Sequence, residues 1–271
     1  MLFSNLFKKK KRNSSQTEYG IVVGENSLSG KMEGYNRLRD NILYINSDNN
    51  HKVLQVESSV AHEGKTTIAS NLAVTLGMIN KKVVVVDLDF RRPRIHRKFE
   101  LSNDNGIADY MLGNIEKKDL IKATKYKNVD IITRGSKVYN ATLILVSDKF
   151  KELIKELREE YDYVILDCAP VLQVSDYINI LQVSDGVVLL VAYGSTTRNQ
   201  VVETVKEIKK NGGKILGTVF SMYDKGKAKA YGYGNSYYGK GYYNYYVTSA
   251  EEEAEENAEP ENQQANKNDQ E

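Results

Sequence analysis

Solid runs of apolar residues alternate along the chain with longer segments in which apolar residues recur every three or four positions. A run such as "KVVVVDLD" at 82–89 is typical of a strand covered on both faces, and a periodic segment such as 33–46 is typical of an amphipathic helix. The predicted strands are 52–59, 82–89, 129–133, 162–167, 186–191 and 214–220, and the predicted helices are 33–46, 64–80, 143–160 and 198–211.

This alternation predicts the α/β class. In such a fold a mainly parallel sheet has helices on both faces, and ligands bind at the carboxyl ends of the strands. The α/β domain is expected to occupy residues 31–222, after a flexible basic segment at 1–30. A tyrosine-rich segment follows at 223–246, and a disordered acidic tail is expected at 247–271.

Charge is divided unevenly along the 271 residues, whose formal net charge is +2. Residues 251–271 hold nine acidic residues and one lysine, a net charge of −8, which leaves +10 on the rest of the chain. A basic body favours phosphate ligands or nucleic acid, and charge alone does not choose between them. The single cysteine, Cys168, excludes an internal disulfide and favours a cytosolic setting. No run of about 18 apolar residues is present that would span a membrane.

The segment "SVAHEGKTT", Ser59 to Thr67, is the strongest indication of chemistry. It matches the phosphate-loop pattern G-x-x-x-x-G-K-[ST], with Ser59 in place of the first glycine, and it lies between a predicted strand and a predicted helix. Backbone N–H groups of such a loop bind phosphate oxygens, aided by the positive end of the helix dipole. Lys65 is expected to reach the β- and γ-phosphates of ATP, and Thr66 to bind Mg²⁺. The expected nucleotide-binding residues are Ser59, His62, Glu63, Gly64, Lys65, Thr66 and Thr67.

Three aspartates, Asp87, Asp89 and Asp167, stand at the ends of predicted strands. In a parallel sheet these ends lie at the same edge as the phosphate loop. Carboxylates gathered there suit a metal–triphosphate site, because Mg²⁺ prefers oxygen ligands. The sequence therefore predicts that the three aspartates and Lys65 surround one magnesium–nucleotide complex.

The segment 90–99, "FRRPRIHRKF", carries five Arg and Lys residues and one histidine. It either attracts an anion, such as ATP, an acidic partner or a phosphotyrosine, or forms a solvated loop and helix start. Nucleic acid is not expected as a partner, because no aromatic stacking platform lies beside the cluster.

The segment 231–246, "YGYGNSYYGKGYYNYY", contains eight tyrosines. Together with the phosphate loop, the motif D-x-D-x-R at Asp87, Asp89 and Arg91, and the third motif at Asp167, it makes the chain resemble the bacterial tyrosine kinases of capsule and exopolysaccharide systems. The resemblance is to the cytoplasmic type, whose transmembrane adaptor is a separate protein, and it runs from about Glu33 to Tyr246.

The resemblance implies a P-loop kinase domain that uses ATP and Mg²⁺ to phosphorylate tyrosines on the tail of a neighbouring subunit. By the family pattern, Lys65 and Thr66 bind phosphate and metal, and Asp89 and Asp167 organise the metal ion. Asp87 is then the candidate that orients the tyrosine hydroxyl or accepts its proton. The implied phosphoacceptors are Tyr231, Tyr233, Tyr237, Tyr238, Tyr242, Tyr243, Tyr245 and Tyr246.

The resemblance also implies a ring of identical subunits that controls polysaccharide synthesis and export. The family's ring-forming pattern E-x-x-R-x-x-R corresponds here to Glu33, Asn36 and Arg39, with a further arginine at Arg37. Glu33, Arg37 and Arg39 are therefore expected at a subunit interface. Other implied partners are the transmembrane adaptor and a cognate tyrosine phosphatase. The implied location is the cytoplasm, at the inner face of the plasma membrane through the adaptor.

Two alternatives share the sheet and the phosphate loop. A partner-switch ATPase of the partition and cell-division-site family carries an extra lysine early in the loop, where this chain has Val60, and lacks a tyrosine tail. A nucleotide-binding regulatory subunit of a polysaccharide machine would keep the loop and have no useful transfer activity.

Overall fold

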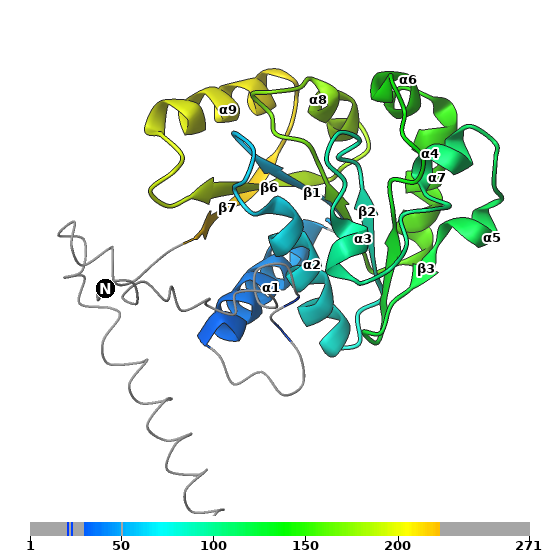
Figure 1. Ribbon diagram of the computed structural model, residues 1–271. Coiled ribbons are helices and arrows are strands. Elements are labelled where there is room, and N and C mark those ends of the chain that lie inside the picture. Colours follow the sequence, from blue (N-terminus) through cyan, green and yellow to red (C-terminus); the bar gives the residue numbers. More distant parts are fainter. Residues whose placement is uncertain (1–20, 22, 24–29, 50, 223–271) are drawn as a thin grey trace, which may run out of the picture. The chain divides into compact units, whose positions relative to one another are not determined.

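A seven-stranded sheet runs through the part of the chain that the computed structural model describes, residues 21, 23, 30–49 and 51–222 (Figure 1). The strands are β1 (Val53–Ser58), β2 (Val83–Asp87), β3 (Lys122–Ala123), β4 (Val129–Ile132), β5 (Tyr163–Asp167), β6 (Gly186–Ala192) and β7 (Ile215–Ser221). The helices are α1 (Gly30–Asn49), α2 (Lys65–Met78), α3 (Ile95–Lys98), α4 (Ile107–Met111), α5 (Lys117–Leu120), α6 (Ala141–Leu145), α7 (Asp148–Glu160), α8 (Asp176–Leu181) and α9 (Arg198–Lys210). The predictions for the tyrosine-rich segment, the acidic tail and most of the N-terminal segment lie outside the described residues.

The strands lie in the order β3-β4-β2-β5-β1-β6-β7, and all pairs are parallel except β3 with β4. The chain runs from β1 outward to β2 and β4, returns to insert β5 beside β1, and then adds β6 and β7 on the other side. The strand order therefore reverses at β1, which is where ligands bind in open parallel sheets. This confirms the predicted α/β fold with a mainly parallel sheet.

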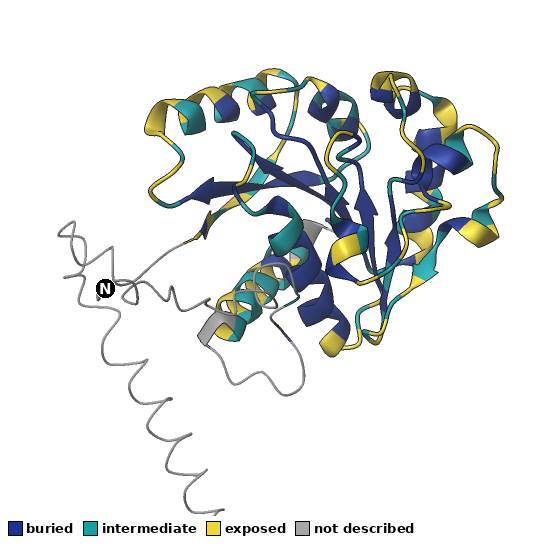
Figure 2. Cartoon of the chain, in the orientation of Figure 1, coloured by how far each residue is buried: buried dark blue, intermediate teal, exposed yellow. Residues whose placement is uncertain are grey.

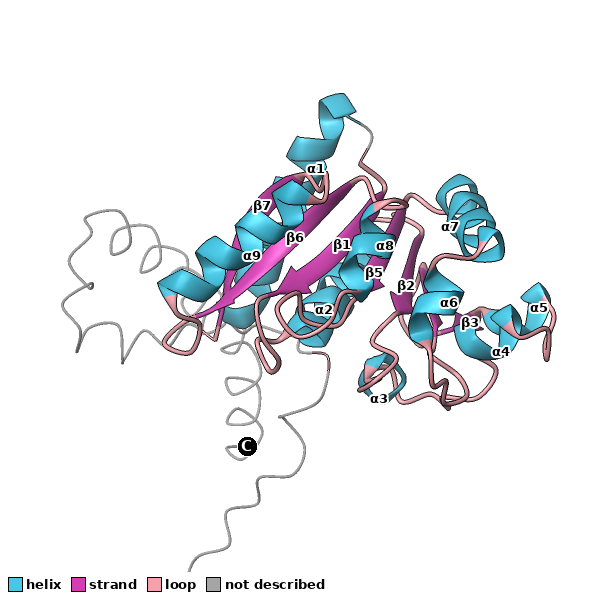
Figure 3. Cartoon of the chain, turned by 90° about the horizontal axis from the view of Figure 1, so that it is seen from above, coloured by secondary structure: helices cyan, strands magenta, loops and turns pink. Residues whose placement is uncertain are grey.

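Helices cover both faces of the sheet, which explains why β2, β5 and β6 are almost wholly apolar (Figure 3). In β2, Val83 and Val85 pack into the cluster that contains α1, α2 and α3. Val84 and Val86 pack into the opposite cluster, with α6 and α7. Because successive side chains of a strand point to opposite faces, a run of four valines fills both layers. Figure 2 shows the result as strands that are buried along their length.

The helix predicted at 143–160 is wrong in its first part, because the chain forms two helices there, α6 and α7. Ser147 separates them: its hydroxyl oxygen accepts the N–H of Phe150 at 3.2 Å and so caps α7. This bond satisfies a backbone N–H in the first turn of α7 that has no acceptor within the helix, so a new helix can begin here. The short elements α3, α4, α5, α8 and β3 were not predicted, since each is too short to show a period.

Gly77 lies where α2 crosses the turn that leads into β4. A β-carbon at Gly77 would come within 2.6 Å of the carbonyl oxygen of Lys127 and 2.7 Å of Val129 Cγ2. We expect Gly77→Ala to lower the free energy of unfolding by about 1–3 kcal/mol, although alanine is the better helix former. Urea or thermal denaturation measures this.

Gly34 in α1 is the matched control, because a β-carbon there would meet nothing within 4 Å. Gly34→Ala should raise the free energy of unfolding by about 0.5–1 kcal/mol. If both substitutions stabilise the protein, the close packing of α2 against this turn is not as described.

Candidate active site

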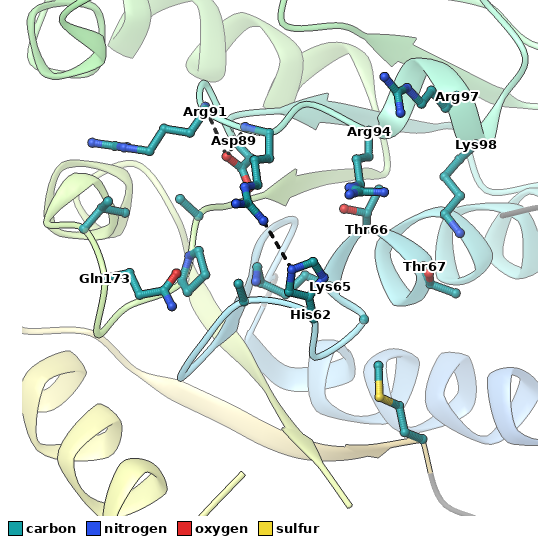
Figure 4. Close-up of a pocket in the computed structure, with 17 residues that line it drawn as sticks. His62, Lys65, Thr66, Thr67, Asp89, Arg91, Arg94, Arg97, Lys98 and Gln173 are labelled. Carbon is teal, nitrogen blue, oxygen red and sulfur yellow. Dashed lines mark hydrogen bonds between the residues drawn. The ribbon is translucent and has the colours of Figure 1, made fainter. Parts of the chain in front are cut away.

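The carboxyl edge of the sheet borders a cavity of about 650 Å³, here called the phosphate-loop hollow (Figure 4). Its walls come from the loop between β1 and α2, the segment from β2 through α3, the loop after β5 and the residue after β7. The residues that line it are Ala61, His62, Gly64, Lys65, Thr66, Thr67, Asp89, Arg91, Arg92, Arg94, Arg97, Lys98, Ala169, Pro170, Gln173, Val174 and Met222.

The loop after β1 turns sharply into α2. His62 has a φ of 66° and Gly64, the N-cap of α2, has a φ of 94°, so both lie in the left-handed region. The N–H of Ile68 donates to the carbonyl oxygen of Gly64 at 2.9 Å, which begins the helix. The N–H groups before it have no helical acceptor, so the first turn of α2 presents donors and a positive dipole end to an anion.

Glu63 fixes this loop to the neighbouring strands. Its side chain is fully buried, and its carboxylate accepts the N–H of Val60 at 2.8 Å and the N–H of Ala192 at 3.4 Å. The hydroxyl of Thr196 also donates to it. The Ser221 hydroxyl donates to the Glu63 carbonyl oxygen at 2.6 Å. One residue thus joins the phosphate loop to the ends of both β6 and β7.

Lys65 extends from the start of α2 back toward β1. Its side chain is 7% exposed, and Nζ donates to Ser58 Oγ at 2.8 Å. Ser58 Oγ in turn donates to the carbonyl oxygen of Val60 at 2.8 Å. The ammonium group is therefore held at the start of the phosphate loop, and Lys65 is one of the residues that line the hollow.

Two carboxyl groups are buried side by side at the ends of β2 and β5. Asp87 and Asp167 are register partners, with exposed fractions of 0% and 1%. Asp87 Oδ2 accepts the N–H groups of Arg94 and Ile95, each at 3.0 Å, and so holds the start of α3. Asp87 Oδ1 and both oxygens of Asp167 are buried without a hydrogen-bond partner in the described part of the chain.

Burial raises the pKa of both carboxyls. The pKa of Asp167 rises to about 7, although the nearby Thr66 hydroxyl and the Lys65 charge lower it again in part. Burial and then the neighbouring Asp167 charge raise the pKa of Asp87 well above its usual range. Two such groups are poorly compensated in the ligand-free protein, and a cation at this edge would favour their ionised forms.

The opposite wall of the hollow is strongly basic. All five cations of the segment 90–99 lie along it, and Arg91, Arg92 and Arg97 among them are also exposed to solvent. Asp89 lies among them, and its Oδ1 accepts the N–H groups of Arg91 at 3.2 Å and Arg92 at 2.9 Å. Figure 4 shows Arg94, Arg97 and Lys98 grouped on the side of Thr66 and Thr67.

Comparison with known proteins agrees with this geometry. The family model described as an AAA domain matches residues 51–217. The tyrosine-protein kinase YwqD of Bacillus subtilis is 31% identical over 224 residues, which are 83% of this chain and 94% of YwqD.

The chain belongs to the bacterial tyrosine-protein kinase family.

Solved structures support the same assignment and confirm the P-loop fold of this tyrosine kinase. The chimerical protein CapA2B2 is 30% identical, with a TM-score of 0.71 over 74% of this chain and 88% of that chain. The cell division ATPase MinD of Pyrococcus furiosus, from the class of the first alternative, is 26% identical, with a lower TM-score of 0.55 over 63% of this chain and 71% of that chain. The kinase therefore shares its sheet with MinD and more of its structure with CapA2B2.

The predicted site residues of the kinase fall into two groups. His62, Gly64, Lys65, Thr66, Thr67 and Asp89 line the phosphate-loop hollow. Ser59, Glu63, Asp87 and Asp167 lie behind its surface and are buried. Ser59 Oγ accepts the hydroxyl of Thr204 in α9 at 2.8 Å, so its side chain supports the loop from beneath.

Several residues that hold and widen the site were not predicted from the sequence. Gln173 and Val174 line the hollow from the loop after β5, and Thr196 and Thr204 anchor the phosphate loop. The signal available for them was their place after predicted strands or on the following helix, which is weak for a single residue.

The residues expected at a subunit interface lie on α1 and do not line the hollow. Glu33 and Arg37 form an exposed ion pair at 2.9 Å, whereas Arg39 is mostly covered and contacts Asp40 and Asn36. Among the described residues, no helix is both long and apolar enough to cross a bilayer.

Glu63→Ala removes the acceptor shared by Val60, Ala192 and Thr196. We expect it to lower the free energy of unfolding by about 1–3 kcal/mol and to weaken ADP binding by roughly tenfold, because the loop loses its anchor. Thermal denaturation and calorimetric titration with Mg–ADP measure the two effects. Glu203→Ala, at an exposed position of α9, is the control and should change neither. Unchanged ADP affinity in Glu63→Ala would contradict the anchoring role.

Asp167 gives the ligand-free kinase a specific pH dependence. Its pKa is about 7 in the fold, whereas an unfolded aspartate ionises near pH ~4. Between about pH 4 and pH 7 the folded protein therefore keeps a proton on Asp167 that the unfolded chain has lost. The stabilisation that this proton gives is lost as the pH rises toward 7. Asp167→Asn removes that loss, so its melting temperature should rise relative to the parent between about pH 5 and pH 8. An equal difference at both pH values, measured without nucleotide and metal, would refute this.

Proposed function

We propose that this tyrosine kinase transfers the γ-phosphoryl group of ATP to tyrosines in the segment 223–246 of neighbouring subunits. One arrangement supports the proposal above all: Lys65 and the phosphate loop lie at the same sheet edge as Asp89 and Asp167, beside a hollow lined by arginines. Phosphoryl transfer passes through a loose transition state, so positioning and charge neutralisation supply most of the rate enhancement.

The donor set at this edge fits Mg²⁺. This ion prefers oxygen ligands and is commonly held by one or two carboxylates together with substrate phosphates. Thr66 lines the hollow, and Asp167 has two buried oxygens without a hydrogen-bond partner in the described part of the chain. We assign Thr66, Asp89 and Asp167 to the ion, which when bound neutralises charge on the β- and γ-phosphates. Lys65 and the loop N–H groups bind the phosphate oxygens.

The surroundings of Asp87 bear on the role proposed for it. One of its oxygens already holds the start of α3, and burial together with the Asp167 charge raises its pKa well above the usual range. Asp89 is the carboxylate that lines the hollow. Asp89 is already assigned to the ion, so Asp87 remains the proposed candidate that orients the tyrosine hydroxyl, since a bound cation would favour its ionised form. A phenol has a pKa near ~10, and its full deprotonation before transfer is unnecessary.

The eight tyrosines from Tyr231 to Tyr246 are the proposed acceptors. Tethering such a segment beside a neighbouring active site raises its effective concentration to roughly millimolar, so weak recognition of each tyrosine is enough. Each phosphate adds about −1.5 to −2 charges, and several would disfavour close packing of tails in one ring. Phosphorylation is therefore proposed to loosen the assembly or release its adaptor.

The biological setting proposed for the kinase is the control of capsule or exopolysaccharide synthesis and export. Its partners are a transmembrane adaptor, further copies that associate in a ring through Glu33, Arg37 and Arg39 on α1, and a tyrosine phosphatase. The proposed location is the cytoplasm, at the inner face of the plasma membrane.

Purified protein incubated with Mg–ATP, with and without the cytoplasmic peptide of the adaptor, should form phosphotyrosine. Lys65→Met should lower the rate at least about 100-fold, because a charge that stabilises the transferring phosphoryl group is lost. Truncation after residue 230 should abolish tail phosphorylation. Mass spectrometry after co-expression with the adaptor identifies the tyrosines used.

Lys209→Met is the matched control, since Lys209 is exposed near the end of α9 and away from the hollow. It should leave the rate unchanged. Hydrolysis of ATP without any phosphotyrosine, in the presence of the adaptor peptide, would reject the kinase proposal and support the partner-switch ATPase.

A further inference from the structure

A second cavity of about 410 Å³ borders the phosphate-loop hollow and is here called the arginine hollow. Its ionisable lining consists of Arg91, Arg92, Arg94, Arg97, Arg134 and His96, and within the described chain no carboxylate lines it. The first four of these arginines also line the phosphate-loop hollow. The two cavities therefore meet along the segment between β2 and the end of α3.

Most of this positive charge has no counter-charge. Arg91 pairs with Asp176, but no carboxylate of the described residues forms an ion pair with Arg92, Arg94, Arg97 or Arg134. Arg134 is held by hydrogen bonds to the carbonyl oxygens of Gly135 at 3.0 Å and Phe90 at 3.3 Å, which fix the guanidinium without neutralising it. Unpaired arginines fixed around a cavity are typical of a phosphate or carboxylate site.

The state of His96 agrees with a positive local field. Burial lowers its pKa first, and the charges of Arg97, Arg134 and Lys122 lower it further. With His96 neutral, the positive charge of the cavity comes from the guanidinium groups of the arginines. Guanidinium groups donate several hydrogen bonds each, so they favour an anion with several strong acceptor oxygens.

The nucleotide does not account for the arginine hollow. Lys65, Lys98 and the N–H groups of the phosphate loop lie on the phosphate-loop hollow alone, and they give it cations of its own. Arg134 and His96 lie on the arginine hollow alone. The second cavity thus has cationic lining of its own and shares a wall with the first.

We propose that the arginine hollow binds the phosphate of a tyrosine that has already been phosphorylated, and so presents the next tyrosine of the same segment to the phosphate-loop hollow. This rests on the proposed kinase function and adds a docking step to it. Successive tyrosines between Tyr231 and Tyr246 are at most four residues apart, a span of up to ~14 Å in an extended chain. Because the two cavities share four arginines, they are adjacent, and a chain segment of this length could reach from one cavity to the other.

Other anions fit less well. A nucleic acid would be held by stacking as well as by phosphate contacts, and no phenylalanine, tyrosine or tryptophan lines the cavity in the described chain. A lipid headgroup would require the membrane to cover the mouth that the tyrosine substrate must use. The chemistry and the position together favour a phosphotyrosyl peptide.

Synthetic peptides of residues 231–246 test the proposal. One peptide carries a single phosphate on Tyr238 and the other carries none; both are titrated by fluorescence anisotropy into full-length, phosphatase-treated protein that is saturated with Mg–ADP. The phosphopeptide should bind at least about tenfold more tightly, a difference of ~1.4 kcal/mol. Equal binding of the two peptides would overturn the proposal.

Variants locate the site. Arg134→Gln should remove most of the preference for the phosphopeptide and leave Mg–ADP affinity unchanged, since Arg134 does not line the phosphate-loop hollow. Arg97→Gln, at an exposed residue without a side-chain hydrogen bond in the described chain, should also reduce the preference and serves if Arg134→Gln does not fold. Arg198→Gln, exposed at the start of α9, is the control and should keep the full preference.

Two further outcomes separate this proposal from its competitors. Retention of the preference in both hollow variants, or binding of phosphatidylserine vesicles in place of the phosphopeptide, would overturn it. A parent protein that phosphorylates the plain peptide but does not prefer the phosphopeptide would reject the docking step and keep the kinase function. Preferential binding of the phosphopeptide without any phosphotyrosine formation would reject the kinase function and keep the phosphotyrosine site.

Discussion

The arrangement on which this domain depends is the burial of two carboxyl groups, Asp87 and Asp167, next to each other at the carboxyl edge of the sheet. Their strands are hydrogen-bonded partners, so the two side chains cannot move apart without loss of the β2–β5 pairing. Desolvation opposes the ionisation of both carboxyls, and the charge of Asp167 further opposes that of Asp87. The sheet thus holds a pair of poorly compensated acids on β2 and β5, and β5 lies next to β1, where the strand order reverses. A bound cation would relieve this, which links the stability of the fold to the chemistry of its site.

The phosphate loop depends on a second, separate constraint. Glu63 gathers donors from its own loop and from the segment after β6, and Ser59 contacts α9 through Thr204. The conformation of the loop is therefore fixed by residues that do not line the phosphate-loop hollow. In this kinase the residues that line the phosphate-loop hollow and the residues that hold them in place are largely different sets, and the second set includes Thr196 and Thr204, which lie outside the motif.

The sequence was sufficient for the sheet and for the centre of the site. Four consecutive valines in β2 predict a strand covered on both faces, and "EGKTT" after β1 predicts the loop that carries Lys65. It was insufficient for Asp87 and Asp89, because β2 ends at Asp87 and the chain then leaves strand geometry, so the period of two no longer says where Asp89 points. The partners of Glu63 lie 129 and 133 residues away, a separation at which a single sequence gives no pairing information. The break between α6 and α7 depends on Ser147, whose side chain caps α7 instead of lying within one continuous helix.

The ion pair between Arg91 and Asp176 has a mechanical consequence. Asp176 is buried at the start of α8, and it also accepts the hydroxyl of Thr142 in α6 at 3.4 Å. Segments that follow two different strands are thereby tied to one carboxylate across the end of β5. A shift of the segment that carries Arg91 must either break this ion pair or move α8 and α6 with it. The segments that follow β2, β4 and β5 are therefore mechanically coupled at the carboxyl edge of the sheet.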